Sequence, residues 1–70
     1  MKLNIIGEKL SALCGERGIT EACLSAKLAE KGVQLSAEEI SEIFSQRRAV
    51  NDIETMAFAE CLDCTVDELF

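Results

Sequence analysis

Three short segments of the chain have the pattern of a helix start, and they constrain the fold more than any other feature. Each has a serine, asparagine or threonine followed three residues later by glutamate, a spacing at which side chains cap free backbone amides reciprocally. The three segments are Ser36–Glu39, Asn51–Glu54 and Thr65–Glu68. Apolar residues recur at steps of three and four, and no segment alternates long enough to predict a strand. The pattern therefore predicts an all-α fold.

The same signals divide the chain into five expected helices. Asn4 and Thr20 are the expected caps of the first two, and Gly18 and Gly32 are expected to end them. The predicted helices run from Ile5 to Arg17, from Glu21 to Lys31, from the Ser36 box to about Ser45, from the Asn51 box onward, and briefly from Thr65. No linker, repeat or low-complexity tract interrupts them. Seventy residues therefore form a single domain.

Helical spacing also predicts which side chains form the core. The expected core residues are Ile6, Leu10, Leu13, Leu24, Leu28, Ile40, Ile43, Phe44, Ile53, Ala57 and Leu62. Met56 is assigned to the same buried side of the fourth helix as Ile53. Glu38 and Glu42 on the third helix are expected to face solvent.

Composition limits the functions that such a domain performs. Thirteen acidic and seven basic residues give a net charge of -6, which opposes approach to a polyanion such as DNA. Histidine is absent, and no glycine-rich phosphate loop or nucleophile beside a base is present, so neither an enzyme nor a cofactor is expected. No apolar run approaches the roughly 18 residues of a membrane span, and the N-terminus lacks signal-peptide features. A cytoplasmic setting with reduced thiols is expected.

Four cysteines equal the number of ligands in a structural zinc site. Cys61 and Cys64 form a C-x-x-C pair, but Cys14 and Cys23 are widely spaced on two different predicted helices. Packing as small apolar residues is therefore favoured over zinc binding, with a redox pair as the third alternative. Cys23 is expected to be the most exposed of the four thiols.

Several short motifs stand along the chain at intervals that are typical of one protein family. They are Ile6-Gly7-Glu8-Lys9-Leu10, Arg17-Gly18-Ile19-Thr20, Lys27-Leu28, Lys31-Gly32-Val33, Arg47-Arg48-Ala49-Val50, Asp52-Ile53-Glu54 and Val66-Asp67-Glu68-Leu69. In these motifs the chain resembles the phage-repressor-like (Cro-like, xenobiotic-response-element) helix-turn-helix regulators over essentially its whole length. The resemblance implies a five-helix lambda-repressor-like domain over residues 1–70, with a helix-turn-helix formed by helices two and three and a homodimer reading two half-sites.

The resemblance also assigns a DNA-binding face. Its residues are Thr20, Glu21, Ala37, Glu38, Ser41, Glu42, Arg47 and Arg48. The chain departs from the family at Glu21, where glutamine is common, and at Glu38 and Glu42, where base-reading side chains are seldom acidic. Cys14 and Phe44 stand where many members pair an arginine with a glutamate, so an apolar contact replaces an ion pair.

Two functions remain open on this sequence. The first is a sequence-specific, repressor-like regulator of transcription that binds double-stranded DNA. The second is a protein-interaction module that presents the acidic third helix to a basic protein partner. Arg47 and Arg48 either clamp phosphate or pair with neighbouring glutamates. A homodimer contact is predicted on the C-terminal helices, through Phe58, Met56 or Phe70.

Overall fold

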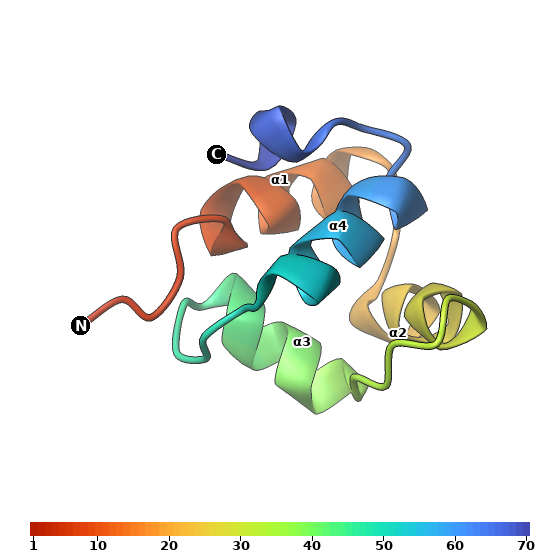
Figure 1. The fold of residues 1–70 in the computed structure, drawn as a ribbon, viewed down its shortest axis with the longest axis horizontal. Helices are drawn as coiled ribbons and strands as arrows, with labels where there is room; N and C mark the ends of the chain where they lie inside the picture. The colour runs from red at the N-terminus through yellow and green to blue at the C-terminus, as the bar shows by residue number, and fades with distance from the viewer.

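The computed structural model describes all of residues 1–70 and contains helices but no strand (Figure 1). Its elements are α1 (Gly7–Glu16), α2 (Glu21–Glu30), α3 (Ala37–Phe44), α4 (Asp52–Cys61) and the 3₁₀ turn η1 (Val66–Leu69). The all-α prediction is confirmed, with four α-helices. The predicted fifth helix is a single 3₁₀ turn. No helix has both the length and the apolar content needed to cross a membrane.

The predicted capping boxes form at the starts of α3 and α4. The Ser36 hydroxyl accepts from the Glu39 amide at 3.1 Å, and the Glu39 carboxylate accepts from the Ser36 amide at 3.0 Å. Asn51 and Glu54 exchange the equivalent pair of bonds at 2.8 and 3.2 Å. At Thr65 only the hydroxyl half of the box is formed. Local sequence therefore determines where these helices begin.

All four α-helices end in the same way, with a left-handed residue directly after the cap. These residues are Gly18, Gly32, Gln46 and Asp63, with φ of 67°, 82°, 63° and 52°. In α3, the amide of Gln46 donates to the carbonyl of Ile43 at 3.0 Å, and that of Arg47 donates to Glu42 at 2.9 Å. This pair of bonds is the Schellman motif, which glycine usually ends. Two of the four ends therefore use residues that carry a Cβ.

Eight of the predicted core residues are buried: Ile6, Leu10, Leu24, Leu28, Ile40, Ile43, Ala57 and Leu62. Leu13 and Phe44 are half-buried and pack against this cluster. The core also contains Cys14, as its predicted packing as a small apolar residue requires, and four residues outside the predicted set: Leu35, Phe58, Ala59 and Leu69. It lies between α1, α2, α3 and α4, and η1 closes it by packing on α1 and α4.

The predicted buried face of α4 is wrong at two positions. Ile53 and Met56 are 72% and 55% exposed, and Phe58 is fully buried. The buried side chains of α4 and its cap are Thr55, Ala57, Phe58, Ala59 and Leu62. Apolar residues occur on nearly every side of α4, so helical spacing does not select one face, and the bulky Phe58 occupies the core. Phe58 is therefore also excluded as a dimer contact.

Candidate nucleic-acid interface

α2 and α3 pack against each other and are joined by a short connection (Figure 1). The Ser25 hydroxyl of α2 donates to the carbonyl of Leu35 in this connection, at 2.5 Å, and Leu35 is itself buried. Ile40 and Ile43 direct α3 into the core. The connection therefore holds α3 against α2 by both a hydrogen bond and apolar packing.

The predicted base-reading residues lie on the side of α3 away from this core. Glu38, Ser41 and Glu42 are exposed, as expected for the two glutamates, and Ala37 is half-buried. The outward face of α3 therefore presents two carboxylates and one hydroxyl to solvent.

Thr20 and Glu21 are placed by the start of α2. The Thr20 hydroxyl accepts from the Cys23 amide at 3.2 Å, which confirms its predicted role as a cap. Glu21 is the first residue of α2, where the helix dipole favours a negative charge. Both residues thus have a local structural role in addition to their predicted position in the interface.

Glu39 belongs to the capping box and is charged at neutral pH. The hydrogen bond from the Ser36 amide lowers the pKa of Glu39, and the Ser36 hydroxyl and the Arg48 charge lower it further. Together with Glu38 and Glu42 it makes three carboxylates on an eight-residue helix.

The two arginines after α3 have different surroundings. The Arg48 guanidinium lies 3.7 Å from the Glu39 carboxylate and 3.3 Å from that of Glu54. Arg47 is exposed, forms no ion pair, and donates from Nε to the Ser45 hydroxyl at 2.9 Å. For Arg48, pairing with neighbouring glutamates is thus the observed arrangement. Arg47 is the member of the pair whose charge is free to meet a phosphate.

Asn4 fixes the backbone that carries these arginines, a contact that the sequence did not reveal. Its Nδ2 donates to the carbonyls of Ile43 and Arg48 at 3.1 and 2.8 Å, and its Oδ1 accepts from the Gly7 amide at 2.8 Å. The prediction that Asn4 is the N-cap of α1 is wrong, because α1 begins at Gly7, two residues later than predicted, and Ile6 is the residue before it. Asn4 still accepts from the first amide of α1 and thereby ties α1 to the end of α3.

Gln46 forms two further hydrogen bonds between the end of α3 and the N-terminal residues. Its buried side chain donates to the carbonyl of Asn4 at 3.0 Å, and its own carbonyl accepts from the Leu3 amide at 2.9 Å. A Cβ added at Gly7 would overlap the carbonyl oxygen of Ile43. We call Leu3–Gly7 the N-terminal strap. The only signals for it in the sequence are the side-chain amide of Asn4, which can both donate and accept, and the absence of a glycine after the third helix.

Three of the four cysteines belong to the core or its margin: Cys14 is part of the core cluster, and Cys61 and Cys64 pack against it. Cys14 is buried, and this burial raises the pKa of its thiol to about 11, so the thiol is protonated at neutral pH. Cys23 is exposed, as predicted. Cys61 and Cys64 are half-buried, and desolvation raises the pKa of each. No group of three or more cysteine or carboxylate side chains is arranged to hold a metal ion.

Cys14 and Phe44 stand at the positions where the resemblance implies a charged pair. Cys14 is part of the core cluster, and Phe44 packs against that cluster. Both positions are therefore apolar, and neither leaves an unpaired buried charge.

No protein-family model, no curated protein and no solved structure matches this chain.

Proposed function

We propose that this chain is a sequence-specific DNA-binding regulator of transcription, with the lambda-repressor-like arrangement implied by its resemblance. In this proposal α2 and α3 form a helix-turn-helix, and the protein acts in the cytoplasm on double-stranded DNA as a homodimer. The supporting observation is that α3 packs on α2 by its apolar side. Its outward face, with Glu38, Ser41 and Glu42, is exposed. A major groove admits a helix presented in this way.

Base reading on this face relies on acceptors. A glutamate carboxylate accepts from the amino group of cytosine, and the Ser41 hydroxyl both donates and accepts. Phosphate contacts fall to Arg47 and Thr20, since Arg48 must first leave Glu39 and Glu54. The net charge of -6 makes nonspecific binding weak, so the affinity depends on the correct bases.

Selection from random duplexes at low salt tests this proposal directly. We expect enrichment of a two-fold symmetric site. Arg47→Ala should weaken binding to that site and reduce the log-log salt slope by about one, the loss of one phosphate contact. Lys9→Ala removes the same charge at a residue outside the predicted interface and should leave the slope unchanged. Absence of any enriched duplex with folded protein would refute the proposal.

The ion pairs of Arg48 favour a second candidate, in which α3 binds a basic protein instead of DNA. One of the two arginines next to α3 is already neutralised, and Glu38 and Glu42 remain exposed. On this alternative no duplex is enriched, and a basic partner recovered by pull-down is lost when Glu38→Gln and Glu42→Arg are combined. Glu16→Gln, at the end of α1, should retain the partner. An enriched duplex would argue against this candidate as the main function.

A further inference from the structure

The Arg48 guanidinium lies between the starts of α3 and α4. Its Nη2 is 3.7 Å from Oε2 of Glu39, and its Nη1 is 3.3 Å from Oε1 of Glu54. The carbonyl of Arg48 accepts from Asn4 of the N-terminal strap at 2.8 Å. We call Arg48, Glu39 and Glu54 the arginine junction. One residue thus contacts both helix starts and the strap.

Both carboxylates of the arginine junction belong to capping boxes. Oε1 of Glu39 accepts from the Ser36 amide, which leaves Oε2 to face Arg48. Oε1 of Glu54 accepts from the Asn51 amide at 3.2 Å and from Arg48 at 3.3 Å. Because each box holds its glutamate against the first turn of its helix, Arg48 pairs with two carboxylates whose positions are already fixed. Less side-chain freedom is lost when such a pair forms.

The arginine junction links two helices that pack mainly on other elements. α3 packs against α1 and α2, whereas α4 packs against α2 and η1. The remaining two ion pairs, Lys2–Glu8 and Lys31–Glu60, do not involve α3. The orientation of α3 relative to α4 therefore depends on Arg48 to a greater extent than on any other charged residue.

Arg48 and Glu54 are better shielded from solvent than the residues of the other ion pairs. Their side chains are 30% and 13% exposed, whereas that of Glu39 is 43% exposed. Loss of the guanidinium would leave the Glu54 carboxylate largely out of water and without its cation, which is unfavourable. A phosphate would have to displace two carboxylates to bind Arg48, whereas Arg47 is exposed and forms no ion pair.

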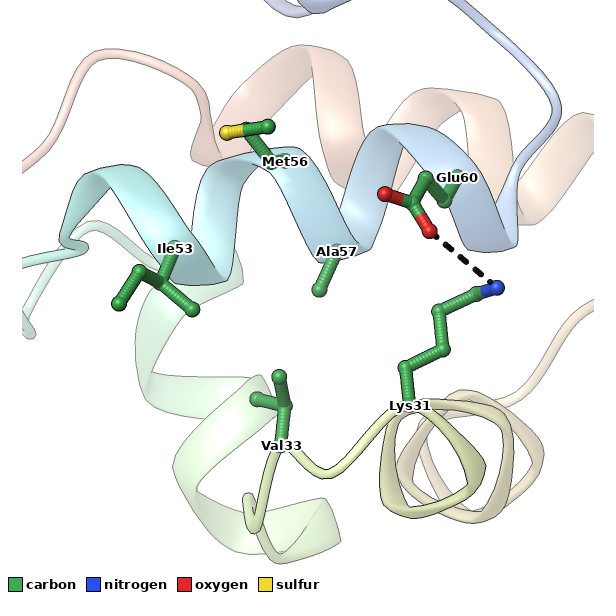
Figure 2. A pocket seen from close by; sticks show the side chains of 6 residues that line it. All are labelled: Lys31, Val33, Ile53, Met56, Ala57 and Glu60. Atoms are coloured by element: carbon green, nitrogen blue, oxygen red, sulfur yellow. Dashed lines mark ion pairs between the residues drawn. The ribbon is translucent and has the colours of Figure 1, made fainter.

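Figure 2 shows a comparable ion pair at the other end of α4, between Lys31 and Glu60. Lys31 Nζ lies 3.3 Å from the Glu60 carboxylate, the same distance as between Arg48 and Glu54. Lys31 directly follows α2, and α3 takes no part in this pair. Removal of either cation changes the net charge by one unit, so Lys31 is the matched control for Arg48.

We propose that Arg48 is a positioning residue for base reading and is not itself a phosphate contact. By holding Glu39, it sets the direction in which α3 presents Glu38 and, one turn further on, Glu42. This role differs from the phosphate contact that the resemblance implies for Arg48. The base-reading part of the inference rests on the proposed function. The arginine junction itself does not.

Amide chemical shifts without DNA test the arginine junction. Arg48→Gln should shift the amides of both capping boxes, residues 36–39 and 51–54, because their glutamates lose a shared cation. Lys31→Gln should leave both sets of amides unchanged. If Arg48→Gln does not fold, Glu39→Gln serves instead, since glutamine retains the capping bond and only the ion pair is lost. Its effect should then reach the Glu54 amide through Arg48.

Binding to the duplex enriched by selection tests the positioning role. The quantity to measure is the ratio of the affinities for that duplex and for one whose enriched bases are replaced. Arg48→Gln should lower this ratio about tenfold, the loss of roughly one base contact, and leave the log-log salt slope unchanged. Glu39→Gln should lower the ratio as well, and Lys31→Gln should not change it. Partial unfolding lowers both affinities by the same factor, so destabilisation alone does not change the ratio.

Two results with DNA overturn the positioning role. A salt slope that falls by about one with Arg48→Gln shows that Arg48 contacts a phosphate. An unchanged affinity ratio shows that Arg48 serves stability alone. Absence of any enriched duplex refutes the proposed function and with it base reading, whereas the amide shifts still decide whether the junction forms. A shift response confined to one capping box overturns the junction, whatever the duplex selection gives.

Discussion

The two ends of α3 are fixed by different kinds of hydrogen bond. At the amino end, Ser36 and Glu39 bond to each other across three residues. At the carboxyl end, Asn4 and Gln46 form bonds between residues 39 to 44 positions apart. The amino end is therefore organised by neighbouring residues, whereas the carboxyl end combines the local bonds of its Schellman motif with long-range bonds to the N-terminal strap. The acidic residues Glu38 and Glu39 lie at the amino end of α3, and Arg47 and Arg48 follow its carboxyl end.

The largest expected effect is at Gly7, where the strap meets α3. Gly7→Ala should destabilise the protein by about 3 kcal/mol, because the new Cβ would overlap the Ile43 carbonyl and force α1 and α3 apart. Gly15→Ala is the control within the same helix, since nothing lies within 4 Å of a Cβ there. It should stabilise the protein by about 1 kcal/mol. Urea denaturation measures both, and equal effects would contradict the close approach at Gly7.

Two asparagines compare the long-range and local bonds directly. Asn4→Ala should cost about 2 kcal/mol, because it leaves the Arg48 carbonyl and the Gly7 amide without their partner and removes one of the two hydrogen bonds to the Ile43 carbonyl. Asn51→Ala removes a local cap of α4 and should cost about 1 kcal/mol. Chemical denaturation of both variants gives the difference. A smaller loss for Asn4 than for Asn51 would mean that the strap adds little beyond an ordinary cap.

Ser36→Ala tests the amino end of α3 alone. Loss of the bond to the Glu39 amide should cost about 1 kcal/mol. Because the capping box is local, amide chemical shifts should change near residues 36–40 and remain constant from Gln46 to Arg48. Shifts that spread to the carboxyl end would show that the two ends are coupled.

The smallest expected effect is a loss of stability at acid pH that arises at the amino end of α3 and not at its carboxyl end. The pKa of Glu39 is lowered in the folded protein, so its contribution to stability is present above the unfolded value of 4.5 and is lost as the pH falls through the folded value. The amides of Asn4 and Gln46 do not titrate in this range. Glu39→Gln should therefore flatten the acid limb of a plot of the urea midpoint against pH. An unchanged limb would exclude Glu39 as a source of the acid dependence.

The same contrast explains how much of the fold follows from sequence. The capping boxes can be recognised in the sequence because the two residues of each box are three positions apart. Gly18 and Gly32 can be recognised because glycine commonly follows the end of a helix. The left-handed conformations of Gln46 and Asp63 are not, since either residue also fits an ordinary loop. On α4, apolar residues on several sides made the buried face ambiguous until the neighbouring helices were in place.

The candidate interface was predictable to a similar extent. The exposure of Glu38 and Glu42 follows from the helical spacing of Ile40 and Ile43. The difference between Arg47 and its neighbour Arg48 does not, because it depends on Glu39 of α3 and Glu54 of α4 both lying within reach of the Arg48 guanidinium. Ion pairs of this kind arise from tertiary packing and leave no pattern in the local sequence.

The N-terminal strap also affects the order in which the chain gains structure. Its bonds close a loop of about 40 residues, at an entropic cost of about 3 kcal/mol that local helix formation does not incur. We therefore expect Leu3 and Asn4 of the strap to join the fold after the helices have collapsed and to detach before they unfold. The Leu3 amide, which donates to Gln46, should exchange with solvent hydrogen faster than the amides within α3. These two residues would thus open separately from the core that Ile6 joins, within a chain of only 70 residues.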